Sequence, residues 1–310
     1  MSWSRSWSRS RSSSWSSTAW LHRRIVRAPA AKPADMTGKT VVVTGASPGS
    51  LGAATARLLA EWGAEVVTTT RSGGSHPLDL TDSGSVRRFA GWYGEQQDTL
   101  DVLINNAWIH LDLMSDWKEP RLSADGYELH WRTNYLGTMQ LTHLLLPTLL
   151  RTAERTGEAR VVNVVSKLHL RGRNALMFSP PPSYSSWNAY GQSKLALVHA
   201  THELQDHHRA AGVRAYALHP GAVCTGIATK GLEGHPVVGT VRKALGPVER
   251  LFLLTPEEGA QTTLMCATEP GLEGGRYFVG CRPVPASDEA EDREVAGRLW
   301  KETEALVSGL

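Results

Sequence analysis

The chain has 310 residues, of which 41% are hydrophobic and 20% are charged. This length and balance predict one large α/β domain with a full core rather than two small domains. The net charge of +3 is unevenly distributed, because residues 1–35 carry seven basic side chains and one acid while the rest of the chain carries 26 basic and 29 acidic groups. The body is therefore slightly acidic and gives no indication of nucleic-acid binding.

Residues 1–35 form an extension that is rich in Arg, Ser and Trp and repeats Trp-Ser-Arg-Ser at positions 3–6 and 7–10. No apolar run here is long enough for a signal peptide or a membrane-spanning helix, so we expect neither export nor a transmembrane segment. Two interpretations stay open. A disordered extension, or upstream sequence read before a start at Met36, leaves the protein cytoplasmic. A transit peptide would direct it to a mitochondrion or another organelle.

The spacing of cysteines and histidines predicts neither a disulfide framework nor a metal site. Cys224, Cys266 and Cys281 form no CxxC pair and are odd in number, which fits a reducing compartment. Histidines cluster at positions 199, 202, 207 and 208, but the segment His202-Glu-Leu-Gln-Asp206 lacks the second histidine of the HExxH zinc motif. We expect this cluster to be a solvated helical face.

From Lys39 onward, short β-branched runs alternate with amphipathic segments, which is typical of βαβ units around a parallel sheet covered on both faces. The expected strands are Thr40–Thr44, Glu65–Thr70, Val102–Asn105, Arg160–Val165, Val213–Leu218 and Arg276–Val279. The expected helices are Leu51–Trp62, Thr81–Tyr93, Ser123–Leu150, Trp187–Ala211, Pro256–Ala267 and Asp288–Val307. Residues 36–310 are thus predicted to form a single Rossmann-type, doubly wound α/β domain.

A glycine-rich turn follows the first expected strand and precedes a helix, and it reads Gly45-Ala-Ser-Pro-Gly-Ser-Leu-Gly52. Glycines let the backbone approach a pyrophosphate closely, and the helix N-terminus supplies free amides. The same residues match G-x-S-x-G, the nucleophile elbow of α/β-hydrolases, in which Ser47 would be the nucleophile. That alternative places the nucleophile on the first strand of the domain, with an unusually short stretch before it, so we favour the dinucleotide turn.

The end of the second strand indicates which dinucleotide binds. It reads Thr68-Thr-Thr-Arg71, with no carboxylate for a ribose 2′-hydroxyl and with an arginine suited to a 2′-phosphate. NADP(H) is therefore favoured over NAD(H). Asp79 and Leu80 follow and are expected beside the adenine ring.

Tyr190 and Lys194 are four residues apart and hence on one face of a predicted helix. A lysine cation beside a phenol favours the phenolate and brings the tyrosine pKa towards the working range for proton transfer. Ser166 ends a buried strand and can hydrogen-bond a substrate oxygen beside the tyrosine. Asn134 is a polar residue in an apolar helical environment, where it is either functional or a satisfied core amide.

At this point the chain resembles the short-chain dehydrogenase/reductase family from about Lys39 to its end. The matching blocks, in order, are Thr44-Gly45 with Gly49 and Gly52, Asn105-Asn106-Ala107, Asn134, Ser166, Tyr190 with Lys194, and Pro220-Gly221-Ala-Val-Cys-Thr225. The C-terminal third is similar to the retinol dehydrogenase-like branch in Thr255-Pro-Glu-Glu-Gly-Ala-Gln261, Gly274-Gly-Arg-Tyr-Phe278 and Arg298-Leu-Trp-Lys301.

The resemblance implies a role for each catalytic residue. Tyr190 would be the general acid in carbonyl reduction and the base in alcohol oxidation, and Ser166 would hold the substrate oxygen. Lys194 would lower the tyrosine pKa and bind the nicotinamide ribose, and Asn134 would anchor a water of the proton relay. The cofactor-binding residues would be Gly45, Ser47, Gly49, Ser50, Leu51, Gly52, Arg71, Asp79, Leu80, Asn106, Ala107, Tyr190, Lys194, Pro220, Gly221, Val223 and Thr225.

The implied substrate is a lipophilic alcohol, aldehyde or ketone such as a retinoid or steroid, with residues 227–254 as a substrate lid. Two departures from the family pattern keep an alternative open, namely a catalytically impaired cofactor sensor or interaction module. The glycine turn is one residue longer than TGxxxGxG, and Trp108 replaces the glycine of NNAG, where it would either line the substrate pocket or obstruct the cofactor. Helices Ser123–Leu150 and Trp187–Ala211 carry apolar stripes that could form a homodimer or belong to the core of a monomer.

Overall fold

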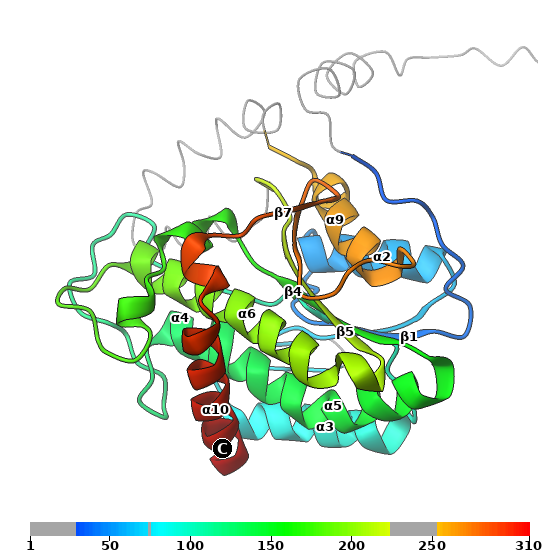
Figure 1. Cartoon of the computed structure of the whole chain (residues 1–310), viewed down its shortest axis with the longest axis horizontal. Helices are drawn as coiled ribbons and strands as arrows, with labels where there is room; N and C mark the ends of the chain where they lie inside the picture. The colour runs from blue at the N-terminus through cyan, green and yellow to red at the C-terminus, as the bar shows by residue number, and fades with distance from the viewer. Residues whose placement is uncertain (1–28, 74–75, 224–252) are drawn as a thin grey trace, which may run out of the picture.

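The computed structural model describes residues 29–73, 76–223 and 253–310. A seven-stranded sheet with the order β2-β1-β3-β4-β5-β6-β7 crosses the middle of the protein (Figure 1). Its strands are β1 Thr40–Val43, β2 Glu65–Thr68, β3 Val102–Asn105, β4 Ala159–Val164, β5 Val213–His219, β6 Tyr277–Val279 and β7 Arg282–Val284. All neighbours are parallel except β6 and β7, which are antiparallel. The six expected strands and the Rossmann-type fold class are confirmed.

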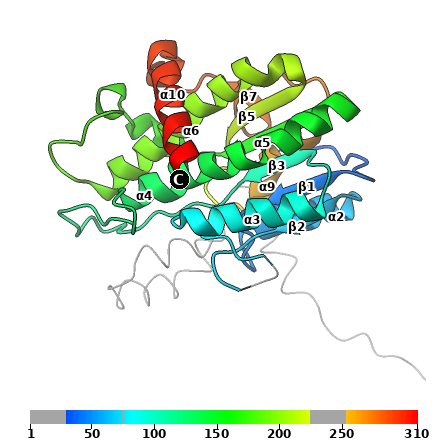
Figure 2. The same ribbon diagram turned by 90° about the horizontal axis from the view of Figure 1, so that it is seen from below.

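Helices cover both faces of the sheet (Figures 1 and 2). Helices α2 (Leu51–Glu61) and α9 (Pro256–Thr268) lie on one face. On the other lie α3 (Ser83–Gln96), α5 (Gly137–Thr156) and α6 (Ser186–His208), with α10 (Arg293–Gly309) packed outside α5 and α6. Side-chain caps fix their starts: Ser50 accepts from Ala53 N at α2, and Thr255 forms a capping box with Glu258 at α9.

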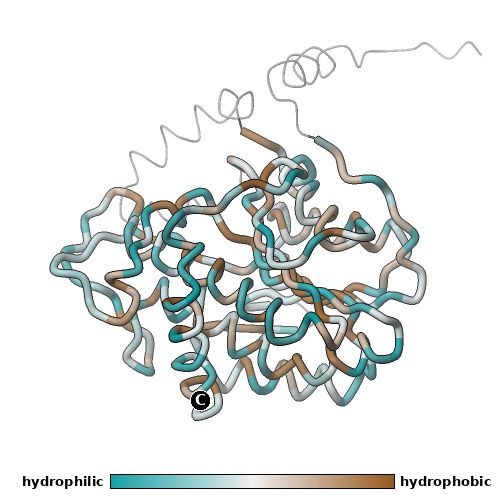
Figure 3. The backbone as a smooth tube through the Cα atoms, viewed as in Figure 1, coloured by the Kyte–Doolittle hydropathy of each residue, from teal (hydrophilic) through white to brown (hydrophobic). Residues whose placement is uncertain are grey.

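The alternation of side chains along each strand divides the core into two clusters. Val41 and Val43 of β1 pack with α2 and α9, whereas Val42 faces α3, α5 and α6. All three valines are fully buried. Figure 3 shows hydrophobic segments running along the central strands and the inward turns of the helices. Strands buried on both faces need continuous β-branched runs, which is why the sequence predicts them well.

The strand order places a crevice at one edge of the sheet. After β1 the chain builds β2 on one side and returns to build β3 on the other, so connections leave β1 and β3 in opposite directions. Ligands of doubly wound folds bind outside the carboxyl ends of the strands at this reversal. The glycine-rich turn follows β1 there, and Asn106 follows β3.

The expected helix Ser123–Leu150 is wrong at its start. Helix α4 (Leu129–Trp131) begins six residues later, because residues before it form a turn with Gly126 at φ +85° and a bridge between Leu122 and Glu128. A π-helix, Arg132–Leu136, then joins α4 to α5. The strand β7 was also not expected, since it is a three-residue exposed edge that contains Pro283.

One expectation about a surface also differs. His199 and His202 are buried rather than solvated, because helix α10 and the turn before it cover that side of α6. The same helix packs on α5 and α6, in line with the core alternative for their apolar stripes. Within the described residues no helix is long and apolar enough to cross a membrane.

The boundary between extension and body also lies earlier than residue 35. Ala31 is buried at 9% exposure and packs in the α2 and α9 core. Its backbone N–H donates to Gln261 Oε1 at 2.9 Å. Residues 29–35 therefore run along the body, and residues 1–28 of the expected extension lie outside the described chain.

Helix α10 is held on α5 and α6 by Trp300, which is 2% exposed and stacks on His207 at 5.3 Å between ring centroids. We expect Trp300→Ala to lower the free energy of unfolding by about 3–5 kcal/mol, because it removes a large buried side chain and leaves a cavity. Leu144→Ala on α5 is the control, since Leu144 is 41% exposed and its loss should change stability by less than about 1 kcal/mol. Urea denaturation followed by circular dichroism measures both, and equal effects would contradict the assignment.

Candidate active site

A cleft of about 700 Å³ lies at the carboxyl edge of the sheet. Loops after β1, β3, β4 and β5 form its walls, and α6 contributes Tyr190. The expected site residues that line it are Gly45, Ser47, Gly49, Ser50, Leu51, Arg71, Asp79, Leu80, Asn106, Ala107, Ser166, Tyr190, Pro220, Gly221 and Val223. Chain segments far apart in sequence thus meet where the strand order predicts a ligand.

The glycine-rich turn is shaped by close contact with the loop after β3. Gly45 has φ +71°, and a Cβ there would lie 2.7 Å from Ala107 Cα. Asn106 Nδ2 donates to Thr44 O at 2.8 Å, and Ala107 N donates to Thr44 Oγ1 at 2.9 Å. Asn106 and Ala107 therefore hold the turn in place as well as lining the cleft, and the N-terminus of α2 opens towards the cleft beside Ser50.

At the other end of the cleft, Arg71 is exposed and lies beside the Leu78–Thr81 segment. Asp79 Oδ1 accepts from both Thr81 N at 2.9 Å and Thr81 Oγ1 at 2.7 Å, so this carboxylate holds the turn before α3. Leu80 is buried, and its carbonyl oxygen accepts from Arg132 at 2.8 Å. Arg71 and Lys167 are the two described Arg or Lys side chains that line the cleft, and Arg71 is the one beside Asp79 and Leu80.

Tyr190 and Lys194 lie on the buried face of α6, at 2% and 1% exposure. Lys194 Nζ donates to Val164 O, at the end of β4, at 3.0 Å and lies 5.7 Å from the centre of the Tyr190 ring. Burial lowers the pKa of Lys194 to about 7. Burial raises the pKa of Tyr190 and the Ser166 side chain opposes that rise. Lys194 is not among the groups that shift the pKa of Tyr190, and burial is the largest influence, so the expected lowering by Lys194 is not found.

Ser166 stands at the point where β4 ends and a short 3₁₀ helix, Lys167–Arg171, begins. Its hydroxyl accepts from Leu168 N at 3.2 Å and lines the cleft next to Tyr190. The two hydroxyl-bearing side chains therefore come from different elements and converge on one end of the cleft.

Asn134 lies in the π-helix and is fully buried. Its Oδ1 accepts from Ile109 N at 2.8 Å, and its Nδ2 donates to Ile109 O at 3.0 Å and to Ser193 Oγ at 3.1 Å. The side chain is thus satisfied by protein and positions the loop after β3. A π-helix at this point fits the frequent use of such bulges at functional sites.

Sequence reasoning missed His110 and did not resolve the place of Trp108. The ring of His110 stacks on Tyr190 with centroids 4.2 Å apart and planes 12° from parallel. Trp108 lies against the same tyrosine at 5.6 Å, and Lys194 Nζ lies 5.5 Å from its indole centre. The only sequence signal for Trp108 and His110 was their position two and four residues after Asn106. No local pattern predicts that either ring packs on Tyr190.

Several expected residues do not join the site as described. Ser47 is exposed, and within the described chain no hydrogen bond joins its side chain to a histidine, so the hydrolase alternative has no triad here. Thr225 and residues 227–252 of the expected lid lie outside the described residues. The residues that flank this segment pair with each other, since Leu254 N donates to Ala222 O at 2.8 Å beside a bridge from Val223 to Leu254.

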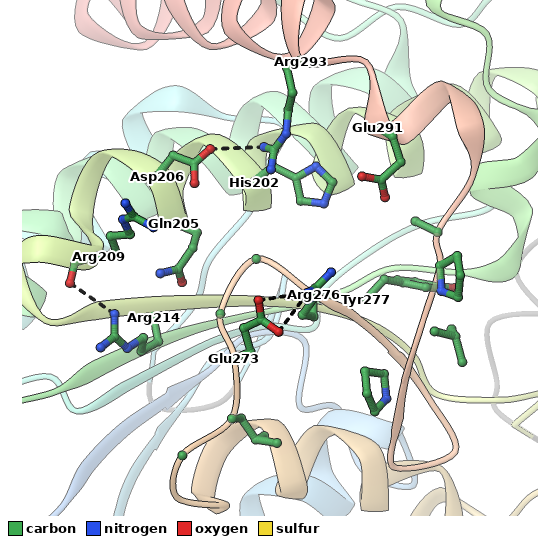
Figure 4. A pocket seen from close by; sticks show the side chains of 18 of the residues that line it. His202, Gln205, Asp206, Arg209, Arg214, Glu273, Arg276, Tyr277, Glu291 and Arg293 are labelled. Carbon is green, nitrogen blue, oxygen red and sulfur yellow. Dashed lines mark hydrogen bonds and ion pairs between the residues drawn. The ribbon is translucent and has the colours of Figure 1, made fainter.

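A second cavity of about 980 Å³ lies between the end of α6, the turn before β6 and the segment after β7 (Figure 4). Its charges are largely paired with one another, as Arg293 with Asp206 at 3.3 Å and Arg276 with Glu273 at 2.9 Å. His202 lines it and is 4% exposed. The expected catalytic residues do not line this cavity.

The buried ammonium of Lys194 predicts a pH dependence of stability. Its pKa is about 7 in the folded protein and near 10.5 in the unfolded chain, so the unfolded state binds more protons between these values. Stability should rise with pH through this window, by at most about 1.4 kcal/mol per pH unit, and fall as pH drops towards 7. Lys194→Met should remove this part of the slope. Urea titrations of both proteins from pH 7 to 9 measure it, and parallel stability curves would contradict the assignment.

The chain was compared with known proteins. The family model described as short chain dehydrogenase matches residues 39–235. Dehydrogenase/reductase SDR family member 13 of Bos taurus is 36% identical over 93% of this chain and 78% of the relative. Retinol dehydrogenase 12 of Bos taurus is 37% identical over 85% of this chain and 84% of the relative. Retinol dehydrogenase 13 of Homo sapiens is 34% identical over 88% of this chain and 86% of the relative.

Solved structures agree with the fold. An uncharacterised protein of Mycobacterium paratuberculosis is 35% identical with a TM-score of 0.64, over 91% of this chain and 96% of its own. A short chain dehydrogenase from Shigella flexneri, solved as a complex with NADP, has a TM-score of 0.59 at 22% identity. The match covers 81% of this chain and 100% of that chain. On the strength of the family model and the curated relatives, the chain belongs to the short-chain dehydrogenase/reductase family of oxidoreductases and is retinol dehydrogenase-like.

Proposed function

We propose that the protein reduces the carbonyl group of a lipophilic substrate, such as a retinoid, steroid or other aldehyde or ketone, with NADPH, and oxidises the matching alcohol in reverse. The observation that carries this proposal is the convergence of Ser166, Tyr190 and Lys194 at one end of a glycine-walled cleft. The names of the curated retinol dehydrogenase relatives support the lipophilic class.

The cleft fits a pyridine dinucleotide. A Cβ at Gly45 or Gly52 would run into neighbouring atoms, which shows how closely the backbone of this turn packs around the entry to α2. Gly45, Ser47, Gly49, Ser50, Leu51 and Gly52 would hold the pyrophosphate, with Pro220, Gly221 and Val223 further along the cleft. Arg71 supports NADP(H) over NAD(H), because it faces the cleft where a 2′-phosphate would lie. When bound, the cofactor supplies or accepts the hydride.

The protein's own groups handle the proton. Ser166 donates a hydrogen bond to the carbonyl oxygen and holds it beside Tyr190. The phenol of Tyr190, whose pKa burial raises further above its ordinary value, is protonated at neutral pH and can donate to the developing alkoxide. Lys194 has a pKa of about 7, so a fraction of the molecules carry its positive charge at neutral pH. That charge stabilises the phenolate formed when Tyr190 gives up its proton.

One observation favours the second candidate, a cofactor-binding protein without catalysis. The Trp108 indole lies 5.5 Å from Lys194 Nζ and tilts towards Tyr190, where the family pattern has a glycine. A side chain in that place could keep the nicotinamide from the tyrosine. Binding of NADPH without turnover of any carbonyl compound would support this candidate over the enzyme.

Replacement of the acid tests the chemistry directly. We expect Tyr190→Phe to lower kcat by at least about a hundredfold, because the ring and its packing remain while the proton is removed. NADPH affinity, measured by quenching of intrinsic tryptophan fluorescence, should change little. Tyr93→Phe on α3 is the matched control, since it also removes one buried hydroxyl, which donates to Thr99 O at 2.8 Å, but does not line the cleft. Undiminished turnover by Tyr190→Phe would refute the proposed acid.

Cofactor choice tests the role of Arg71. Arg71→Ala should lower kcat/KM for NADPH about tenfold or more and leave NADH nearly unchanged, because only NADPH carries the 2′-phosphate. Arg155→Ala on the exposed end of α5 is the control for loss of one surface charge. Equal losses with both cofactors would show that Arg71 does not read the phosphate.

A further inference from the structure

Two histidines lie next to Tyr190, and their bonding differs. His130 is fully buried, and both of its ring nitrogens are used: Nε2 accepts from Leu111 N at 3.0 Å and Nδ1 contacts Glu128 Oε1 at 2.7 Å. Because a backbone N–H can only donate, Nδ1 carries the proton of His130. Glu128 also accepts from Tyr184 at 3.0 Å. His130 is therefore a satisfied structural residue.

His110 has no such partners. It is 6% exposed, yet its Nε2 is buried without a hydrogen bond in the described part of the chain. Burial, with smaller contributions from His130 and Lys194, lowers the pKa of His110 to about 3, so the ring is neutral at pH 7. An unpaired buried polar group destabilises a fold by about 1–3 kcal/mol and calls for a functional reason.

The place of His110 supplies that reason. Its ring lies flat on Tyr190 and lines the cleft, with Trp187 edge-on at 4.6 Å on its other flank. A substrate whose carbonyl oxygen is held by Tyr190 and Ser166 would lie beside His110, because all three side chains line the same cleft. The neutral ring offers one donor and one acceptor there.

We propose that His110 is a specificity-determining residue that hydrogen-bonds a second oxygen on the substrate, next to the reacting carbonyl. This inference rests on the proposed function and narrows its substrate class to lipophilic α-dicarbonyl and α-hydroxycarbonyl compounds. The second oxygen must be adjacent, because the imidazole lies only one stacking layer from the phenol that holds the first. The aromatic rings of Trp108 and Tyr190 line the same cleft and suit conjugated or aromatic substituents.

Benzil and deoxybenzoin test the proposal, since they share two phenyl rings and differ by one oxygen beside the reacting carbonyl. We compare kcat/KM for NADPH-dependent reduction of both by the wild type and by His110→Phe, which keeps an aromatic ring on Tyr190 but removes the nitrogens. The ratio of benzil to deoxybenzoin should fall about tenfold in the variant, while deoxybenzoin alone changes little. The greater intrinsic reactivity of benzil cancels in this comparison.

Two further variants separate specificity from structure. His110→Gln retains a hydrogen-bonding side chain and should recover part of the benzil preference. His202→Phe replaces another buried histidine with an unpartnered nitrogen, far from the cleft at the second cavity (Figure 4), and should leave the ratio unchanged. Binding of both ketones to NADPH-loaded Tyr190→Phe, with and without His110→Phe, repeats the comparison without turnover.

The outcomes distinguish the inference from the function on which it rests. Equal losses for both ketones in His110→Phe, or an unchanged ratio, would overturn the role of His110 while reduction itself stands. Failure of the wild type to reduce benzil, deoxybenzoin or any simple aldehyde, despite NADPH binding, would overturn the proposed function and the inference with it.

Discussion

The active site depends on one buried amide. Asn134 bonds both backbone groups of Ile109 and also Ser193, whose hydroxyl donates to Tyr190 O at 2.7 Å. It thereby joins the π-helix, the loop after β3 and helix α6. If any of these bonds were lost, a polar group would stay buried without a partner, so the three segments hold one another in place. The π-helix supports this by adding a residue to the turn that carries the amide.

The loop after β3, which Asn134 holds, contacts the rest of the site at both of its ends. Towards its start, Asn106 and Ala107 bond Thr44 and press on Gly45, which fixes the glycine turn after β1. Towards its end, Trp108 and His110 lie against Tyr190. One short loop therefore shapes the cofactor end and the reacting end of the cleft together, so a change in it should affect both.

The sequence predicted whatever is encoded locally. Continuous β-branched runs marked six strands, and the spacing of Tyr190 and Lys194 placed both on one helix face, as the structure shows. It did not predict contacts made through space. The start of α4 was misplaced because Gly126 and its turn interrupt an apolar pattern that otherwise continues, and α10 was not recognised as the cover of α5 and α6.

The tyrosine pKa shows why local reasoning fails at the site itself. The four-residue spacing of Tyr190 and Lys194 suggests an ammonium beside a phenol. The sequence does not show that this face of the helix is shielded from solvent. In the structure both groups are almost fully buried, and burial favours the neutral form of each. In the proposed reaction, the phenol would stay protonated until an alkoxide forms, and a charge on Lys194 would then become favourable. The neutral His110 ring stacked on the phenol belongs to the same dry environment, where a single hydrogen bond to substrate discriminates more strongly than it would in water.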